Sequence, residues 1–303
     1  MNMPKKPLLI GAIYFLLFSL LFFGFMFWVA HFSEKGVGIG EKIALIRIEG
    51  VILDSNDVVE ELRRYRKDDS VKAILLRIDS PGGGVVPSQE IYDEVKQIRQ
   101  EGKKKVVTSM GTVAASGGYY IASASDKIIA NPGTLTGSIG VIMEFANVEG
   151  LLQKIGVESV VIKSGKNKDL GSPFRKMKEE ERVLLQGVID DVHGQFIEAV
   201  AESRSLEVES VRALADGRIF TGRQAKKIGL VDELGSFQDA VQKTAELAGI
   251  QGEPRMVEER KRFSIFEIVR SQLRGSGVGR WMSLGAAAPL PSASVRLNFL
   301  LAF

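Results

Sequence analysis

The chain has 303 residues, a formal net charge of +3, 45% hydrophobic residues and 25% charged residues. This length is enough to bury a sizeable core in one α/β domain or two smaller ones. The small, scattered charge gives no indication of nucleic-acid binding, which requires a dominant basic face. There is no cysteine, and the two histidines, His31 and His193, are far apart. We therefore expect no disulfide, no thiolate ligand for a metal and no zinc site.

Residues 7–32 form an apolar segment without a charge, and Lys5 and Lys6 precede it. About 20 apolar residues in a helix suffice to cross the hydrocarbon layer of a membrane. A cleaved signal peptide is the alternative, but its apolar core is normally shorter, and a small-x-small cleavage site is missing here. We therefore expect an uncleaved, single-pass anchor in an inner (cytoplasmic) membrane. Residues 1–6 would lie inside and the folded domain on the outer, periplasmic side.

Residues 33–40 are typical of a short flexible linker. Beyond them, apolar runs with β-type patterning alternate with amphipathic helical stretches. Strands are predicted over residues 43–48, 71–78, 105–109, 127–130 and 157–162, and helices over residues 58–65, 87–100 and 115–125. This alternation predicts βαβ units, and therefore an α/β domain with a largely parallel sheet covered on both faces.

The second half of the chain begins with a long amphipathic helix predicted over residues 178–204, with apolar side chains on one broad face, from Val183 to Val200. A further helix is predicted over residues 237–248, and we place the end of the folded domain, 41–250, just after it. The remaining segment, residues 251–303, contains a predicted helix, a Gly/Ala/Pro-rich stretch and an apolar tail. Their ranges are residues 263–273, 275–291 and 295–303.

Ser116 is the candidate nucleophile, because it lies where small residues lead into a predicted helix. A serine at a helix N-terminus feels the positive end of the helix dipole, which stabilises alkoxide character and an adjacent oxyanion. Simple helix capping is the alternative, because serine is a favoured N-cap residue. With so few histidines, a catalytic Ser116 needs a base other than imidazole, and lysine is the candidate.

Three lysines follow the strand predicted at residues 157–162, in the sequence Lys163-Ser-Gly-Lys166-Asn-Lys168-Asp. A lysine acts as a general base only when it is neutral, so its pKa must fall from about 10.4 towards neutrality. Desolvation and a nearby helix N-terminus both favour that fall. Activation of serine by lysine is a variant of the catalytic triad. Periodicity does not identify which lysine turns inward, and an exposed basic loop remains the interpretation for Lys163 and Lys166.

Two glycine-rich segments complete the candidate site. Asp79-Ser-Pro-Gly-Gly-Gly84 follows a predicted strand, and its backbone N–H groups are free of side chains that would shield an oxyanion. In the second segment, Asn131–Val141, glycines flank Ser138, and the functional interpretation is that its hydroxyl orients a lysine amine. A structural turn is the alternative for both segments.

Taken together, these segments resemble the signal peptide peptidase A family. The motifs that carry the resemblance are Asp79-Ser-Pro-Gly-Gly, Ala115-Ser116-Gly-Gly-Tyr-Tyr-Ile-Ala, Thr136-Gly-Ser-Ile-Gly-Val, Lys163-Ser-Gly-x-x-Lys168-Asp and the segment Gly217–Asp232. They occur in the right order between about residues 42 and 247. The resemblance implies a membrane-anchored serine protease of the ClpP/crotonase fold with a Ser/Lys dyad, in the half-length form of the family.

The resemblance also implies roles for individual residues. Ser116 matches the nucleophile, Lys168 the general base and Ser138 the hydroxyl that binds the lysine. The backbone amides of Gly83 and Gly117 match the oxyanion hole. The implied activity is an endopeptidase that degrades remnant signal peptides in or at the membrane, without metal or cofactor. The implied assembly is a homo-oligomeric ring of about eight chains, in which Lys168 reaches Ser116 of a neighbour.

Two other functions remain open from the sequence. A crotonase-like acyl-CoA hydrolase or hydratase shares the fold and a glycine oxyanion hole, and in a non-catalytic membrane scaffold Ser116 would only cap a helix. The apolar tail at residues 295–303 has alternatives too. It adds edgewise to a substrate groove in its own or a neighbouring chain, completes the domain as a strand, or frays.

Overall fold

The computed structural model describes residues 14–27, 41–259 and 298–300. The chain divides into two units, residues 1–40 and residues 41–303. In the first unit, residues 14–27 form a helix, and the rest of the segment predicted to span a membrane lies outside the described residues. Among the described residues, no helix has both the length and the apolar character needed for crossing a membrane. The predicted helix at residues 263–273 and the stretch at residues 275–291 also lie outside the described residues.

The second unit is built on an eight-stranded, mostly parallel sheet. Its strands follow the order β7-β6-β4-β2-β1-β9, and β5 pairs with both β4 and β8. The β6–β7 pair is antiparallel, and the other pairs are parallel. The strands are β1 (Lys42–Glu49), β2 (Val71–Ser80), β4 (Lys105–Ala115), β5 (Lys127–Ala130), β6 (Leu135–Gly137), β7 (Ile219–Thr221), β8 (Glu233–Leu234) and β9 (Arg255–Glu258).

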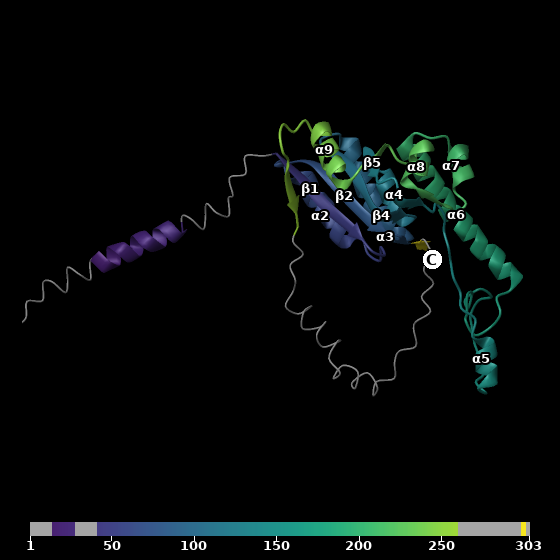
Figure 1. Ribbon diagram of the computed structural model, residues 1–303. Helices are drawn as coiled ribbons and strands as arrows, with labels where there is room; N and C mark the ends of the chain where they lie inside the picture. Colours follow the sequence, from purple (N-terminus) through teal and green to yellow (C-terminus); the bar gives the residue numbers. More distant parts are fainter. Residues whose placement is uncertain (1–13, 28–40, 260–297, 301–303) are drawn as a thin grey trace, which may run out of the picture. The chain divides into compact units, whose positions relative to one another are not determined.

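Helices cover both faces of this sheet (Figure 1). The helices of this unit are α2 (Asn56–Lys67), α3 (Val85–Glu101), α4 (Gly117–Ser123), α5 (Glu149–Lys154), α6 (Glu179–Arg204), α7 (Val208–Leu214), α8 (Gly222–Lys227) and α9 (Phe237–Leu247), of which α5 lies away from the sheet. Side chains alternate between the faces along each strand. Ile46 of β1 therefore joins the core under α2, α3, α4 and α6, whereas Leu45 joins a smaller core under α9.

The strands predicted near residues 43, 71, 105 and 127 are confirmed, as is the α/β class with a mostly parallel sheet. Strand β4 runs on to Ala115, so the helix predicted from residue 115 begins at Gly117. The sheet also continues beyond residue 250, because β9 pairs with β1. The strand predicted at residues 157–162 is wrong: this segment pairs with no strand among the described residues, and Ile162 is 97% exposed.

The long helix predicted at residues 178–204 is confirmed as α6, but its apolar face is only half buried. Phe196 and Val200 in its second half are buried in the core, whereas Val183 and Val188 in its first half are exposed. The reason is that the first half of α6 extends beyond the sheet towards α5 (Figure 1). We call residues 142–190, which include α5 and this half of α6, the projecting arm.

Glu61 on α2 gives a test of how the edge of this domain responds to pH. Burial and the nearby Glu259 carboxylate raise the pKa of Glu61 from 4.5 to about 7. Between these values the folded protein keeps a proton that the unfolded chain has lost, so the free energy of unfolding falls as pH rises through this window. Because the side chain is partly exposed, the change is about 1 kcal/mol, which corresponds to about 2–4 °C in Tm.

We therefore expect Glu61→Gln to raise Tm at pH 8 and to leave it nearly unchanged at pH 4.5. Thermal unfolding followed by circular dichroism at both pH values measures this. Glu60→Gln, at the exposed neighbouring position on the same helix, is the control. An equal rise in Tm at both pH values would contradict the explanation.

Candidate active site

Ser116 occupies a sharp turn between β4 and α4. Its φ of 53° and ψ of −119° lie in a region that non-glycine residues rarely adopt. Such strain persists only where the surroundings fix the backbone. Here the Ser116 N–H donates to the Gly137 carbonyl at 2.8 Å, and the Ser116 carbonyl accepts from the Tyr120 N–H at 2.8 Å. A strained strand-to-helix turn is also how α/β hydrolases present a nucleophile.

The Ser116 hydroxyl does not cap the helix. Helix α4 has no side-chain hydrogen bond at its N-terminus, and the Ser116 Oγ has no hydrogen-bond partner among the described residues. The residue is only 1% exposed. A buried hydroxyl without a partner is costly, and in this position it is available to react.

A short strand, β3 (Gly82–Gly84), lies against the start of α4. A Cβ on Gly117 would stand 3.3 Å from the Gly82 Cα and 3.3 Å from the Gly83 nitrogen. Both distances are tighter than an ordinary van der Waals contact of a Cβ atom, so the two backbone segments approach each other closely. The structure therefore brings Gly83 and Gly117 together, as the motifs predict.

The hydrogen bonds of the neighbouring peptides set the direction of both amides. Ile52 donates to the Gly82 carbonyl and accepts from the Gly84 N–H, at 2.9 and 2.8 Å. Because successive residues of a strand point to opposite edges, the N–H and carbonyl of Gly83 face away from Ile52. The Ser116 carbonyl points along α4, so the Gly117 N–H of the same trans peptide points out of the start of the helix. Two amides directed in this way are what an oxyanion hole requires.

The chain's own tail lies on the edge of β3 that Gly83 faces. Strand β10 (Asn298–Leu300) pairs with β3 in antiparallel orientation, with Phe299 opposite Gly83. Residues 298–300 of the tail predicted to be strand-like thus form a strand. This strand pairs with the glycine strand β3 and not with the eight-stranded sheet.

Ser138 lies beside Ser116. Strands β4 and β6 pair with Ala115 opposite Gly137, so the two serines follow paired residues. Ser138 also has a positive φ, 50°, and is buried. Its N–H donates to the Arg218 carbonyl at 2.9 Å, which fixes the turn.

Lys168 lies on the projecting arm, in a loop held by ion pairs. Asp169 binds Lys163 and, at 2.8 Å, Arg175, and these two cations hold the pKa of Asp169 well below its usual range. Lys166 pairs with Glu180. Lys168 is exposed, and of the three lysines in this loop it is the one without an ion pair among the described residues.

Within one chain, the structure does not bring Lys168 to Ser116. A lysine amine at hydrogen-bonding distance would be a partner of the Ser116 Oγ, and the described residues provide none. His193, on α6, is not a partner either. The catalytic pair predicted from the sequence is therefore split between the sheet domain and the projecting arm.

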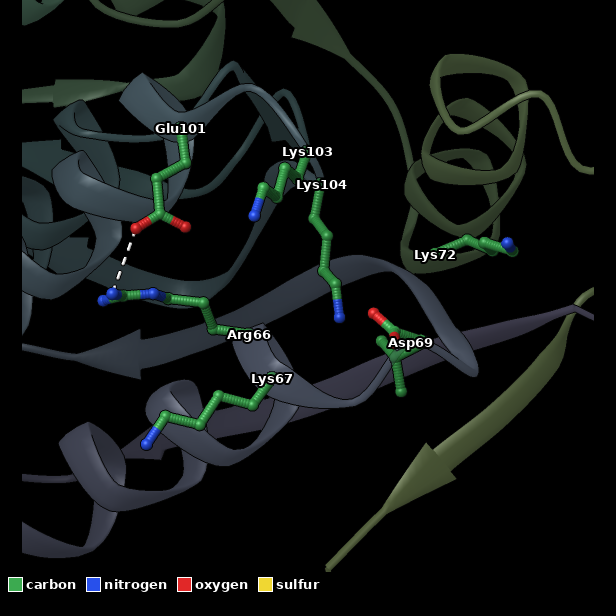
Figure 2. Close-up of a pocket in the computed structure, with 8 residues that line it drawn as sticks. Arg66, Lys67, Asp69, Lys72, Glu101, Lys103 and Lys104 are labelled. Carbon is green, nitrogen blue, oxygen red and sulfur yellow. Dashed lines mark ion pairs between the residues drawn. The ribbon is translucent and has the colours of Figure 1, made fainter.

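A basic cavity of about 660 Å³ lies at the other end of the strands and is not this site (Figure 2). Its lining includes Lys104, which precedes β4, whereas Ser116 follows β4. Lys104 donates to the carbonyls of Tyr65 and Asp68 at the end of α2, and Arg66 pairs with Glu101 at 3.0 Å. These cations stabilise the C-terminal ends of α2 and α3, where cations are favourable.

Sequence reasoning missed two polar side chains that shape the site. The Asp79 carboxylate accepts from the Val113 N–H at 3.0 Å and holds the bend of β4 that leads to Ser116. The Ser88 hydroxyl is buried against Gly117. The signal for Asp79 is its place at the start of the glycine-rich motif, directly after a predicted strand. Ser88 carries no local signal, because serine in the first turn of a helix is common.

A reactive serine in a strand-to-helix turn, two converging backbone amides and a strand edge that accepts an extended segment define a serine protease of the ClpP type. The model of peptidase family S49 matches residues 98–251, and the Clp protease model matches residues 44–134. The chain belongs to peptidase family S49, as a serine protease of the signal peptide peptidase A group.

Three relatives illustrate the similarity. A putative protease of Synechocystis is 50% identical over 211 residues, which cover 69% of this chain and 76% of the relative. A putative protease of Methanocaldococcus jannaschii is 36% identical over 84% of this chain and 86% of the relative. A putative signal peptide peptidase of Enterococcus faecium is 39% identical over 69% of this chain and 64% of the relative.

The ion pairs of Asp169 give a prediction for the loop that carries Lys168. Asp169→Asn removes the charge that holds Lys163 and Arg175, so we expect faster amide hydrogen exchange in residues 163–175 and lower peptidase activity. Exchange followed by mass spectrometry measures the first effect. Asp190→Asn, at an exposed position of α6, is the control. Unchanged exchange in the loop would show that these ion pairs do not order it.

Proposed function

We propose that this protein is a membrane-anchored endopeptidase that degrades remnant signal peptides with a Ser116/Lys168 dyad. The observation that carries the proposal is the arrangement around Ser116. The buried, unpartnered hydroxyl lies where the Gly83 and Gly117 amides converge, beside a strand edge on which an extended segment is already seated. Such an edge binds a peptide by main-chain hydrogen bonds, largely independently of its sequence.

In the proposed mechanism, neutral Lys168 takes the proton of the Ser116 hydroxyl as Oγ attacks the scissile carbonyl. The N–H groups of Gly83 and Gly117 stabilise the oxyanion. The lysine ammonium then gives its proton to the leaving amine, and the C–N bond breaks. A water molecule, deprotonated by the same lysine, hydrolyses the acyl-enzyme and frees Ser116. Ser138 orients the lysine amine.

We infer that Lys168 acts on Ser116 of a neighbouring copy, in a ring of about eight chains. Two features support this. Neither the Ser116 hydroxyl nor the Lys168 amine has a partner in its own chain among the described residues. In addition, the projecting arm exposes apolar side chains, among them Val160 and Ile162, that a second copy would cover.

The sequence and the name of one relative support the proposed membrane location and substrate. Residues 7–32 are apolar and uncharged, and residues 14–27 are helical. A protease held at the membrane surface by this segment meets apolar peptides released within the bilayer. One relative is named as a putative signal peptide peptidase. Because alanine and glycine surround Ser116, we expect small or apolar side chains next to the cleaved bond.

Combining two variants that are each expected to be inactive tests both the Ser116/Lys168 dyad and whether neighbouring chains share it. We expect Ser116→Ala and Lys168→Ala each to lower kcat by about 10³-fold or more, because either change removes a partner of the proton transfer. Co-expressed, the two variants regain part of the activity, since some neighbours combine an intact serine with an intact lysine. Peptide hydrolysis and labelling of Ser116 by a fluorophosphonate measure this.

Either variant alone retaining full activity would refute the dyad. Mixed assemblies shown by affinity tags to contain both variants, yet inactive, would refute the sharing. Binding of coenzyme A in a calorimeter would instead favour the acyl-CoA hydrolase. If purified wild-type protein neither hydrolyses peptides nor is labelled, the scaffold function is favoured.

The tail strand should compete with substrate for the edge of β3. A tethered segment acts at an effective concentration of about 1 mM. We therefore expect deletion of residues 292–303 to lower KM severalfold at unchanged kcat. Phe299→Pro should act in the same direction, because proline cannot donate a strand hydrogen bond. Steady-state kinetics measure both variants, and an unchanged KM in both would show that the tail does not occupy the groove in solution.

A further inference from the structure

We propose that Ser88 is a positioning residue of the oxyanion hole: its buried hydroxyl sets the spacing between the Gly83 and Gly117 amides. This inference rests on the proposed peptidase function and adds to it a residue outside the Ser/Lys dyad. Ser88 lies in the first turn of α3, directly after the glycine strand β3, and is completely buried.

One contact of the Ser88 hydroxyl is with β3. The hydroxyl donates to the Gly84 carbonyl at 2.8 Å. A bond from a serine hydroxyl to the carbonyl four residues earlier is common in helices and alone would indicate no function. Here, however, the acceptor is the last residue of the strand that provides the Gly83 amide. The bond therefore fixes the side-chain rotamer relative to that strand.

The second contact of the same oxygen is with Gly117. A Cβ on Gly117 would lie 2.5 Å from the Ser88 Oγ and 3.3 Å from the Gly83 nitrogen. The hydroxyl thus fills the space beside the Gly117 Cα, next to the Gly83 amide. It contacts both backbone segments whose N–H groups would bind the oxyanion.

Removal of this oxygen would loosen a strained element. Ser116 keeps its unusual backbone angles because the residues around it are fixed, and Gly117 directly follows it. A gap beside Gly117 lets the turn relax, which moves the Gly117 amide away from the Gly83 amide. The Ser80 hydroxyl holds the other end of β3 by accepting from the Gly82 N–H at 3.0 Å, so β3 itself keeps its position. The change is therefore confined to the distance between the Gly83 and Gly117 amides.

Removal of the Ser88 hydroxyl should affect binding of the transition state more than binding of the substrate. A displaced oxyanion donor weakens stabilisation of the transition state more than binding of the extended peptide, which uses the strand edge. Loss of a whole donor costs about 10²–10³-fold in kcat, so for a donor displaced by a neighbouring gap we expect about tenfold.

The experiment compares Ser88→Ala with Thr244→Val in the full-length protein. Thr244 is a matched control, because it is also fully buried and its hydroxyl donates to a carbonyl four residues earlier, that of Ala240, at 2.6 Å in α9. The readouts are kcat, KM, Tm and the inhibition constant of a peptide aldehyde, whose adduct with Ser116 places an oxygen in the oxyanion hole.

We expect Ser88→Ala to lower kcat about tenfold, with KM within about twofold, and to weaken the aldehyde by a factor similar to the loss in kcat. Thr244→Val should leave kcat and aldehyde affinity within about twofold of wild type. The proposal is overturned if Ser88→Ala keeps its kcat, if its loss appears in KM alone, or if Thr244→Val loses as much. Failure of the proposed function has a different signature, since hydrolysis by the wild type would then not depend on Ser116.

Discussion

The site depends on a close approach between two pieces of backbone, the glycine strand β3 and the start of α4. A Cβ on Gly117 would make tight contacts of 3.3 Å with both Gly82 and Gly83, and it would collide with the Ser88 hydroxyl at 2.5 Å. A Cβ on Gly83 would likewise collide with the backbone of Ile52 on its other side. This packing holds two N–H groups at fixed positions beside Ser116. Donors fixed before the reaction need no reorganisation when charge develops on the substrate, which is the largest single source of catalysis in many enzymes.

The same arrangement leaves the catalytic pair incomplete within one chain. The two amides proposed to bind the oxyanion belong to the sheet domain, whereas Lys168 belongs to the projecting arm. The ion pairs of Asp169 with Arg175 and Lys163 hold the loop around Lys168. The Lys168 side chain is exposed and is not turned towards Ser116 of its own chain. A lysine acts as a general base only when its amine is neutral, and desolvation favours the neutral form. Burial against a second copy would supply the desolvation that the proposed mechanism needs, so assembly and activity would be coupled.

Local patterns predicted the parts of the fold that local physics determines. Apolar runs with β-type composition predicted β1, β2, β4 and β5, and small-residue motifs pointed to Ser116 and its neighbours. Hydrophobic periodicity in the sequence indicates that one face of a helix is apolar, but it does not indicate whether the chain's own core or another molecule covers that face. For that reason the apolar face predicted along α6 is exposed in its first half, and residues 157–162 have strand composition but pair with no strand in the part of the chain that the structure describes. The positive φ of Ser116 and the contact of Ser88 arise from tertiary packing, which no short window of sequence contains.

The pairing of strand β10 with β3 indicates which form of peptide fits beside Ser116. Antiparallel pairing with β3 places a segment of ordinary L-residues along the edge that Gly83 faces, so a peptide of the same extended form fits there without rearrangement of the sheet domain. Such pairing requires the substrate to be unfolded, because a folded protein does not offer a free strand of this kind at its surface. A signal peptide freed from its protein meets that condition as soon as its helix opens. In the proposed function, this backbone pairing would favour released peptides over folded proteins, whatever the side chains beside the scissile bond.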